Sequence, residues 1–128
     1  MLGIKITTDC EVKKIDVSEP LHISIREELG GHLEIVRPRR LKQPLCMIVD
    51  EEGLLKKLPV NLMGSYLYET DKHGHPVVGD IIIMKEQMTI DGIELIGLSA
   101  QDISDFMQEH KDALYHFERC VKDGVVQV

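Results

Sequence analysis

The residues best suited to metal binding or proton transfer are the six histidines, because imidazole ligates metals and titrates near neutral pH. His73 and His75 are separated by one residue, and Asp71 lies two residues before His73, so one loop offers three potential ligands. An H-x-H pair alone is a weak signal, and no second cluster with metal-ligand spacing accompanies it. We therefore expect no bound metal, and a solvated turn or a small-molecule contact there. A small metal-dependent hydrolase or nucleotide-processing enzyme using these three residues stays the catalytic alternative.

Other catalytic arrangements are weaker. No G-x-S-x-G elbow or phosphate-binding P-loop occurs, and the densest carboxylate group, residues 50–52, lies between two apolar runs as a solvated turn would. His110 falls on the apolar face of an expected helix, where a structural role is usual. Cys10, Cys46 and Cys120 are far apart with no CxxC pair, which is typical of reduced, buried or inert thiols. The sequence thus predicts neither covalent catalysis nor a cofactor.

A run of four cations is the sharpest charge feature, formed by Arg37, Arg39, Arg40 and Lys42 around Pro38. Guanidinium groups match phosphate or carboxylate oxygens in a bidentate manner, and proline holds such a segment extended. One interpretation is a solvated loop that keeps a sheet edge from pairing. The other is a binding site for a phosphate, a nucleotide or an acidic protein, with the three arginines as ligand-binding residues.

Composition and charge exclude several classes of protein. The 128 residues, 43% hydrophobic and 29% charged, fit one domain, and no apolar run approaches the roughly 20 residues of a membrane span, so we expect a cytoplasmic protein. The whole net charge of −7 falls in residues 65–128, and aromatic residues are only 4%, which disfavours direct nucleic-acid binding. An acidic nucleic-acid mimic is a further alternative.

Apolar periodicity predicts an α+β domain, with a mostly antiparallel sheet covered by two or three helices and a long C-terminal amphipathic helix. Ser18 is expected to cap the first helix, Asn61 to open a short helix or turn, and Ser99 to cap the last helix, which is continuous or broken near His110. An apolar stripe on the last helix either seals the core or faces a second subunit, which would make the protein a homodimer. The expected elements are strands at 3–8, 11–17, 33–37 and 77–84, helices at 18–30 and 99–124, hairpins at 45–57 and 88–98, and an edge strand at Val125–Val126.

Four segments in the first two-thirds of the chain resemble a known family. They are residues 31–37, 48–53, 58–61 and 67–80, of which the stretch from Asn61 to Gly79-Asp80 is the most specific. They are similar to the DUF3846-like family, small domains of unknown function found in bacteria, phages and plasmids. The similarity is expected over about residues 3–85, with residues 86–128 as a C-terminal hairpin and helix extension.

The resemblance implies a genetic setting rather than a mechanism. Its members look like accessory proteins of mobile elements, so we expect a non-enzymatic binding protein of a phage or mobile element. Such a protein could counter host defence by binding a host protein or by sequestering a small phosphorylated or anionic ligand. The resemblance implies that the ligand site is built from the motif residues, which are Glu34, Asn61, Tyr68, Asp71, His73, Gly74, Pro76, Gly79 and Asp80.

Overall fold

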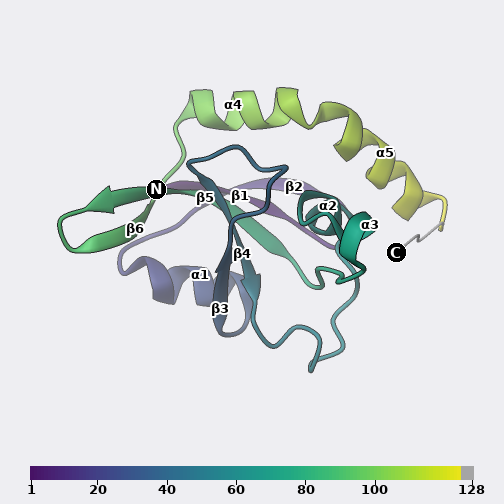
Figure 1. The fold of residues 1–128 in the computed structure, drawn as a ribbon, viewed down its shortest axis with the longest axis horizontal. Coiled ribbons are helices and arrows are strands. Elements are labelled where there is room, and N and C mark those ends of the chain that lie inside the picture. The colour runs from purple at the N-terminus through teal and green to yellow at the C-terminus, as the bar shows by residue number, and fades with distance from the viewer. Residues whose placement is uncertain (125–128) are drawn as a thin grey trace.

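The computed structural model describes residues 1–124 and shows the expected α+β class, with a six-stranded antiparallel sheet and five helices in that range. The expected strand at Val125–Val126 lies outside the described residues. Figure 1 shows the sheet as a central layer between one helix on one side and the remaining helices on the other. The elements are β1 (Leu2–Ile6), β2 (Val12–Asp16), α1 (Leu21–Leu29), β3 (Leu33–Val36), β4 (Leu45–Asp50), α2 (Leu62–Leu67), α3 (Thr70–His73), β5 (Ile81–Thr89), β6 (Gly92–Ile96), α4 (Ala100–Glu109) and α5 (Lys111–Lys122).

The strand order is β2-β1-β5-β4-β3, and β6 pairs with the second half of β5 on the edge that β1 leaves free. β5 is the central strand, and its residues 81–84 are completely buried. Such a run of four apolar residues is what a strand covered on both faces requires, since successive side chains point to opposite faces. β4 is also an interior strand, as the apolar run at 45–49 indicated, because it pairs with both β5 and β3.

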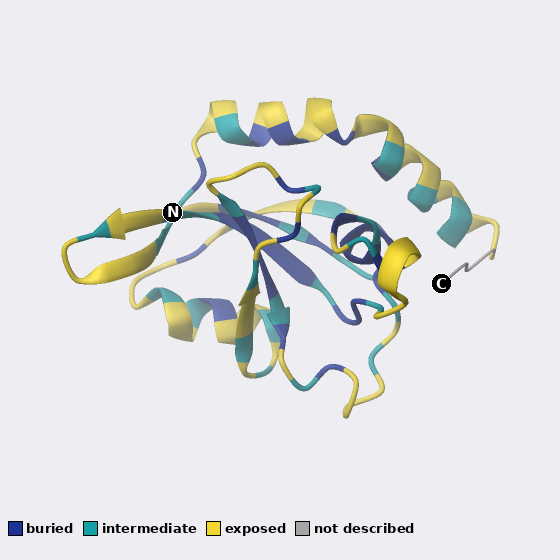
Figure 2. Cartoon of the chain, in the orientation of Figure 1, coloured by how far each residue is buried: buried dark blue, intermediate teal, exposed yellow. Residues whose placement is uncertain are grey.

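Each face of the sheet has its own apolar cluster. On one face α1 packs Ile25 against Ile82 and Met84, and on the other face α2, α4 and α5 cover Ile81 and Ile83. Figure 2 shows that α4 and α5 turn their buried sides toward the sheet and their exposed sides outward. The predicted stripe of the last helix therefore contributes to the protein's own core, through Ile103, Phe106, Leu114 and Phe117.

Several local predictions are confirmed by side-chain geometry. The Asn61 side chain accepts a hydrogen bond from the Gly64 N–H at 2.9 Å and so caps α2. Ser99 and Asp102 form a reciprocal capping box at the start of α4. The last helix is divided at His110 into α4 and α5. β5 and β6 form the predicted hairpin, although Ile90 and Asp91 connect them rather than Asp91 and Gly92, because Gly92 already pairs with Thr89.

Three local predictions were wrong. Residues 51–57 form turns rather than the second strand of a hairpin, because the buried Asp50 side chain accepts the Glu52 N–H and closes the chain on itself. Ser18 does not cap α1: Pro20 occupies the N-cap, and the Ser18 N–H donates to the Ser24 hydroxyl instead. The expected strand at 77–84 begins four residues later and extends to Thr89.

Candidate functional site

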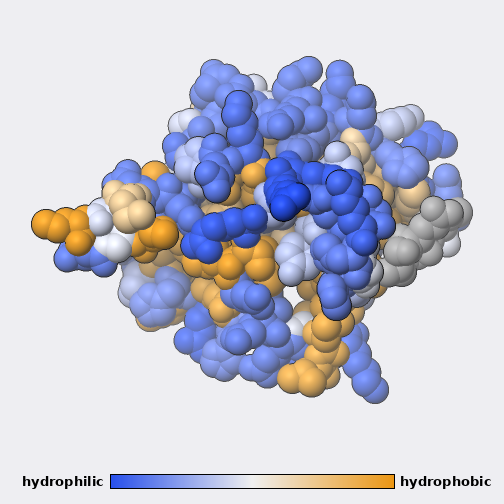
Figure 3. All heavy atoms as spheres, in the orientation of Figure 1, coloured by the Kyte–Doolittle hydropathy of each residue, from blue (hydrophilic) through white to orange (hydrophobic). Residues whose placement is uncertain are grey.

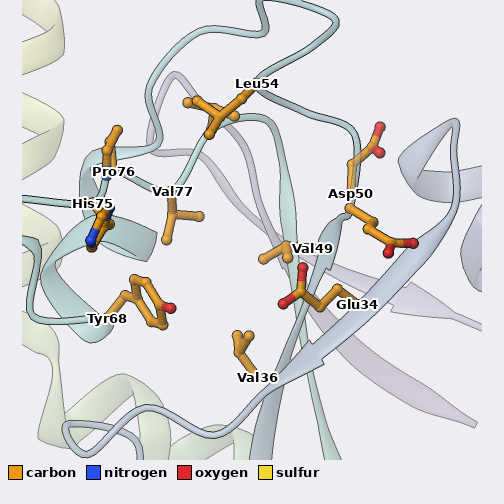
Figure 4. A pocket seen from close by; sticks show the side chains of 11 residues that line it. Glu34, Val36, Val49, Asp50, Leu54, Tyr68, His75, Pro76 and Val77 are labelled. Carbon is orange, nitrogen blue, oxygen red and sulfur yellow. The ribbon is translucent and has the colours of Figure 1, made fainter.

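A groove of about 400 Å³ opens beside the edge strand β3, on the sheet face that α2, α4 and α5 partly cover. Its floor comes from β3 and β4, one wall from the turn after β4, and the other wall from the segment that runs from Tyr68 to Val78. Figure 4 shows the Tyr68 ring and the Glu34 carboxylate directed into the same space. The lining residues are Glu34, Val36, Val49, Asp50, Glu51, Leu54, Tyr68, His75, Pro76, Val77 and Val78.

The floor follows from the two-residue period of paired strands. Glu34 lies opposite Val49, and Val36 lies opposite Met47, so all four side chains belong to one face of the sheet. Met47 is completely buried, whereas Glu34 is exposed and Val36 and Val49 are half-buried. The helices therefore cover the interior of this face and leave its β3 side open, which creates an apolar floor with one carboxylate at its rim.

The turn after β4 forms the first wall and is held by Asp50. The Asp50 Oδ1 accepts the Glu52 N–H at 2.9 Å, and Oδ2 lies 2.7 Å from the Lys56 ammonium, which also donates to the Gly30 carbonyl at 3.2 Å. Burial alone would raise the Asp50 pKa, but the Lys56 ammonium and the Glu52 N–H outweigh it and bring the pKa below its ordinary value. The charged carboxylate thus fixes the turn that carries Leu54.

The second wall is held by His73, which stands behind Tyr68. The His73 Nδ1 accepts the His75 N–H at 3.1 Å, so Nε2 must carry the proton that is donated to the Tyr68 carbonyl at 2.7 Å. The His73 and Tyr68 rings also meet edge to face, with centroids 5.0 Å apart. The Thr70 hydroxyl donates to the His75 carbonyl at 2.6 Å, and Gly74 supplies the left-handed backbone that reverses the chain. His73 therefore positions the wall and does not itself line the groove.

Polar groups in the groove are free to meet a ligand. Within residues 1–124, the Glu34 and Glu51 carboxylates and the Tyr68 hydroxyl form no hydrogen bond or ion pair. The lining contains three carboxylates and no lysine or arginine, and only Asp50 is neutralised, by Lys56. Figure 3 shows hydrophobic atoms in the hollow at the front of the molecule and on the turn below it, where Leu54 is 67% exposed. The groove therefore suits an apolar group that carries a positive charge.

The arginines of the basic run differ in their contacts with carboxylates of the same chain. Arg37 makes an ion pair with Glu86, at 2.7 Å from Nη2 to Oε1 and 2.9 Å from Nε to Oε2. Arg40 binds both carboxylate oxygens of Asp71, at 2.8 and 3.1 Å, and this guanidinium lowers the Asp71 pKa. Arg39 is exposed, without an ion pair among the described residues. Two of the three arginines are thus neutralised by carboxylates of the same chain.

The remaining predicted site residues lie outside the groove. Asn61 is 1% exposed, and its amide donates to the Ile6 carbonyl at 3.0 Å and to the Gly79 carbonyl at 2.9 Å, so both of its N–H donors are used inside the core. Asp80 accepts the Thr8 N–H at 3.1 Å and lies 3.8 Å from the Lys5 ammonium. Of the eight residues predicted as ligand-binding, only Tyr68 lines the groove.

The His73 and His75 rings lie 5.3 Å apart between centroids, but Asp71 does not join them. Residues 1–124 contain no group of three His, Cys, Asp or Glu side chains arranged to hold a metal ion, and Asp71 turns to Arg40 rather than to the histidines. All three cysteines are free, as expected, and burial raises the pKa of Cys10 to about 11 and that of Cys46 to about 12, so neither thiol ionises readily. Within the same range no helix has the length and hydrophobicity needed to cross a bilayer.

Sequence reasoning missed most of the apolar lining of the groove. Val36, Val49 and Leu54 come from segments read as ordinary strand or hairpin, and nothing local shows that helices leave them uncovered. The available signal was weak: the period of two places Glu34 and Val36 on one face, and Leu54 follows a glycine inside a turn, where an apolar side chain is unusual.

Comparison with protein-family models matches residues 1–111 to DUF3846, a domain of unknown function. The chain belongs to this family. The matched region contains the groove, and it also extends beyond residue 85, where the resemblance was expected to end, through β6 and α4. The comparisons with curated proteins and with solved structures found no match.

Proposed function

We propose that this DUF3846 protein is a non-enzymatic recognition domain whose partner binds in the groove beside β3. The observation that carries the proposal is the pairing of an apolar floor with free polar groups, Glu34 and Tyr68, at a rigidly built hollow. Binding sites commonly combine apolar walls with a few oriented polar groups. Two of the three residues of the catalytic alternative, in contrast, are occupied in structural contacts: the His73 ring by two hydrogen bonds and Asp71 by Arg40, which leaves His75 alone in the groove lining.

The charge of the groove decides which kind of partner we propose. A small phosphorylated ligand would need the arginines, and it would have to displace Glu86 from Arg37 or Asp71 from Arg40. The groove itself is lined by carboxylates, which repel an anion. A partner protein is therefore favoured over a sequestered anion. The resemblance to accessory domains of phages and mobile elements supports the proposal that this partner is a host protein.

Affinity capture from host lysate with a matched set of variants tests the proposal. The double variant Leu54→Ser and Tyr68→Ala removes apolar lining without touching the core, because both side chains are exposed, at 67% and 36%. The control is Tyr115→Ala, which removes an exposed tyrosine on α5, far along the chain from the groove. Circular dichroism first verifies that each variant is folded.

The expected result is one or more host proteins enriched by the wild type and the control and lost with the double variant. Hydrogen exchange of the captured complex should then show protection in β3 and in the turn after β4. Equal enrichment by all three proteins, or no enrichment by the wild type, would overturn the proposal.

A further inference from the structure

We infer that the partner binds as an extended segment, which pairs with the free edge of β3 and places a lysine or arginine side chain between Glu34 and Tyr68. The inference rests on the proposed function and specifies the class of partner. Two independent features of the molecule carry it: the backbone of an unpaired strand edge and the acidic, apolar groove next to that edge.

The β3 edge exposes backbone groups in a usable register. The Glu51 N–H donates to the His32 carbonyl, which fixes residue 32 as pointing toward β4. Inward and outward backbone groups alternate along an antiparallel strand, so Glu34 and Val36 also point toward β4, whereas Leu33 and Ile35 direct their N–H and C=O groups outward. Within residues 1–124 no strand pairs with this side of β3. An incoming strand therefore finds two residues with free donors and acceptors.

An added strand would bring its side chains into the groove. Neighbouring strands lie about 4.8 Å apart, so alternate side chains of the incoming segment fall beside Glu34 and Val36 on the groove face. The other side chains fall beside Ile35, which is 36% exposed on the opposite face. Both faces of the edge thus offer apolar contact, as strand addition requires for affinity and specificity.

The charge of the occupant follows from the groove lining. The free carboxylates of Glu34 and Glu51 attract a cation, and the exposed Tyr68 ring adds the π face on which an ammonium or guanidinium packs favourably. The aliphatic stem of a lysine or arginine matches the valine floor, while its charged end reaches the rim. A negatively charged side chain at the same position would be repelled.

The other open edges of the sheet lack this combination. The outer edge of β2 carries the exposed Lys13 and Lys14, which discourage the addition of a strand. The outer edge of β6 has one exposed carboxylate, Glu94, which does not line the cavity of about 370 Å³ that Met88 and Ile93 border. Glu94 therefore supplies a matched control for Glu34: an exposed glutamate in the middle of an edge strand.

Short synthetic peptides with alternating valine and threonine and one variable central residue provide the probe. The central residue is lysine, arginine, acetyl-lysine, norleucine or glutamate, and binding is followed by ¹⁵N chemical-shift titration. We expect the lysine and arginine peptides to shift the amides of Leu33, Ile35 and Tyr68, and to bind at least about tenfold more tightly than the glutamate peptide. Glu34→Gln should weaken the lysine peptide several-fold and leave the norleucine peptide unchanged, whereas Glu94→Gln should change neither.

The outcomes separate this inference from the proposed function. If all five peptides bind the groove equally, or if Glu34→Gln weakens every peptide alike, the cationic specificity is overturned while groove binding stands. If no peptide shifts the β3 amides, strand addition is overturned, and the lysate capture still decides the proposed function. A lysine peptide methylated at the backbone nitrogens that face β3 should lose binding, and unchanged affinity would also refute pairing at the edge.

Discussion

The ion pair between Asp50 and Lys56 gives the most direct test of how the groove is built, through the variant Lys56→Met. The Asp50 side chain is 3% exposed, and Lys56 supplies its 2.7 Å contact, so the variant leaves a buried carboxylate with the Glu52 N–H alone. A hydrogen bond to a charged group contributes about 1.5–3 kcal/mol. Breaking a fully buried ion pair costs about 3–5 kcal/mol, but Lys56 is 36% exposed, so we expect a loss of about 2 kcal/mol at neutral pH.

The loss should depend on pH in a defined direction. Burial raises the Asp50 pKa, but the contacts with Lys56 and Glu52 lower it by a larger amount, so that the folded pKa lies below the ordinary 3.8. The unfolded chain therefore takes up the proton first, and the stabilisation by charged Asp50 is complete above that value and is lost as the pH falls below it. In Lys56→Met the buried Asp50 carboxylate has only the Glu52 N–H as a partner, so protonation of Asp50 removes most of the destabilisation of the variant. The difference between the two proteins should shrink markedly from about pH 7 to about pH 3.

Urea unfolding followed by far-ultraviolet circular dichroism measures both effects, because the chain has no tryptophan to report by fluorescence. Lys57→Met is the control: it removes a charge from the same turn, and Lys57 forms no ion pair within residues 1–124. A Lys56→Met protein within about 0.5 kcal/mol of the wild type at neutral pH would refute the reasoning. So would an equal loss at both pH values, because the pair would then contribute through packing rather than charge.

Two further predictions concern the groups that are buried in the core. His110 is 5% exposed, and its Nε2 has no hydrogen-bond partner among the described residues. Burial lowers its pKa below 6.5, so the unfolded chain takes up the proton at a higher pH than the folded protein does. Stability is therefore lost as the pH falls below about 6.5. His110→Leu should reduce the drop in urea midpoint between about pH 7.5 and 5.5, and an unchanged drop would contradict this cause. A thiol reagent at mildly alkaline pH should label the half-buried Cys120 rapidly and Cys10 and Cys46 slowly, with Cys120→Ser removing the fast phase; fast reaction of all three would contradict their burial.

Periodicity predicted the elements whose structure is decided by nearby residues. The apolar run of β4, the hairpin of β5 and β6 and the capping box of α4 each depend on residues a few positions apart, and each is confirmed. The turn at 51–57 was misread because its closure depends on the buried side chain of Asp50, which accepts the Glu52 N–H and contacts Lys56, and the sequence does not show that this carboxylate is buried. Composition alone could not distinguish that turn from the second strand of a hairpin.

The contacts of the basic run likewise could not be predicted from nearby residues. Three arginines in four residues indicated an anion site, but the carboxylates that neutralise Arg37 and Arg40 lie 49 and 31 residues further along the chain. The groove is also formed by residues distant in sequence, since Glu34 precedes β4 in the chain and Tyr68 follows the turn after β4. Tyr68 was identified through the resemblance to a family motif, and no property of its immediate neighbours indicated its position.

The polar motif between residues 61 and 80 divides into residues that build the site and residues that face it. Asn61 joins the end of β1 to the turn at Gly79, and His73 and Gly74 hold the reversal that aims Tyr68. These contacts are saturated within the protein, so a ligand gains little by approaching them. We therefore assign recognition to Tyr68 and to the β3 side of the groove, where the Tyr68 hydroxyl, the Glu34 carboxylate and the outer backbone groups of β3 have no partner within residues 1–124. Under the proposed function, the segment from residue 61 to 80 therefore mainly supports the site, and Glu34 on β3 supplies the charge that selects the partner.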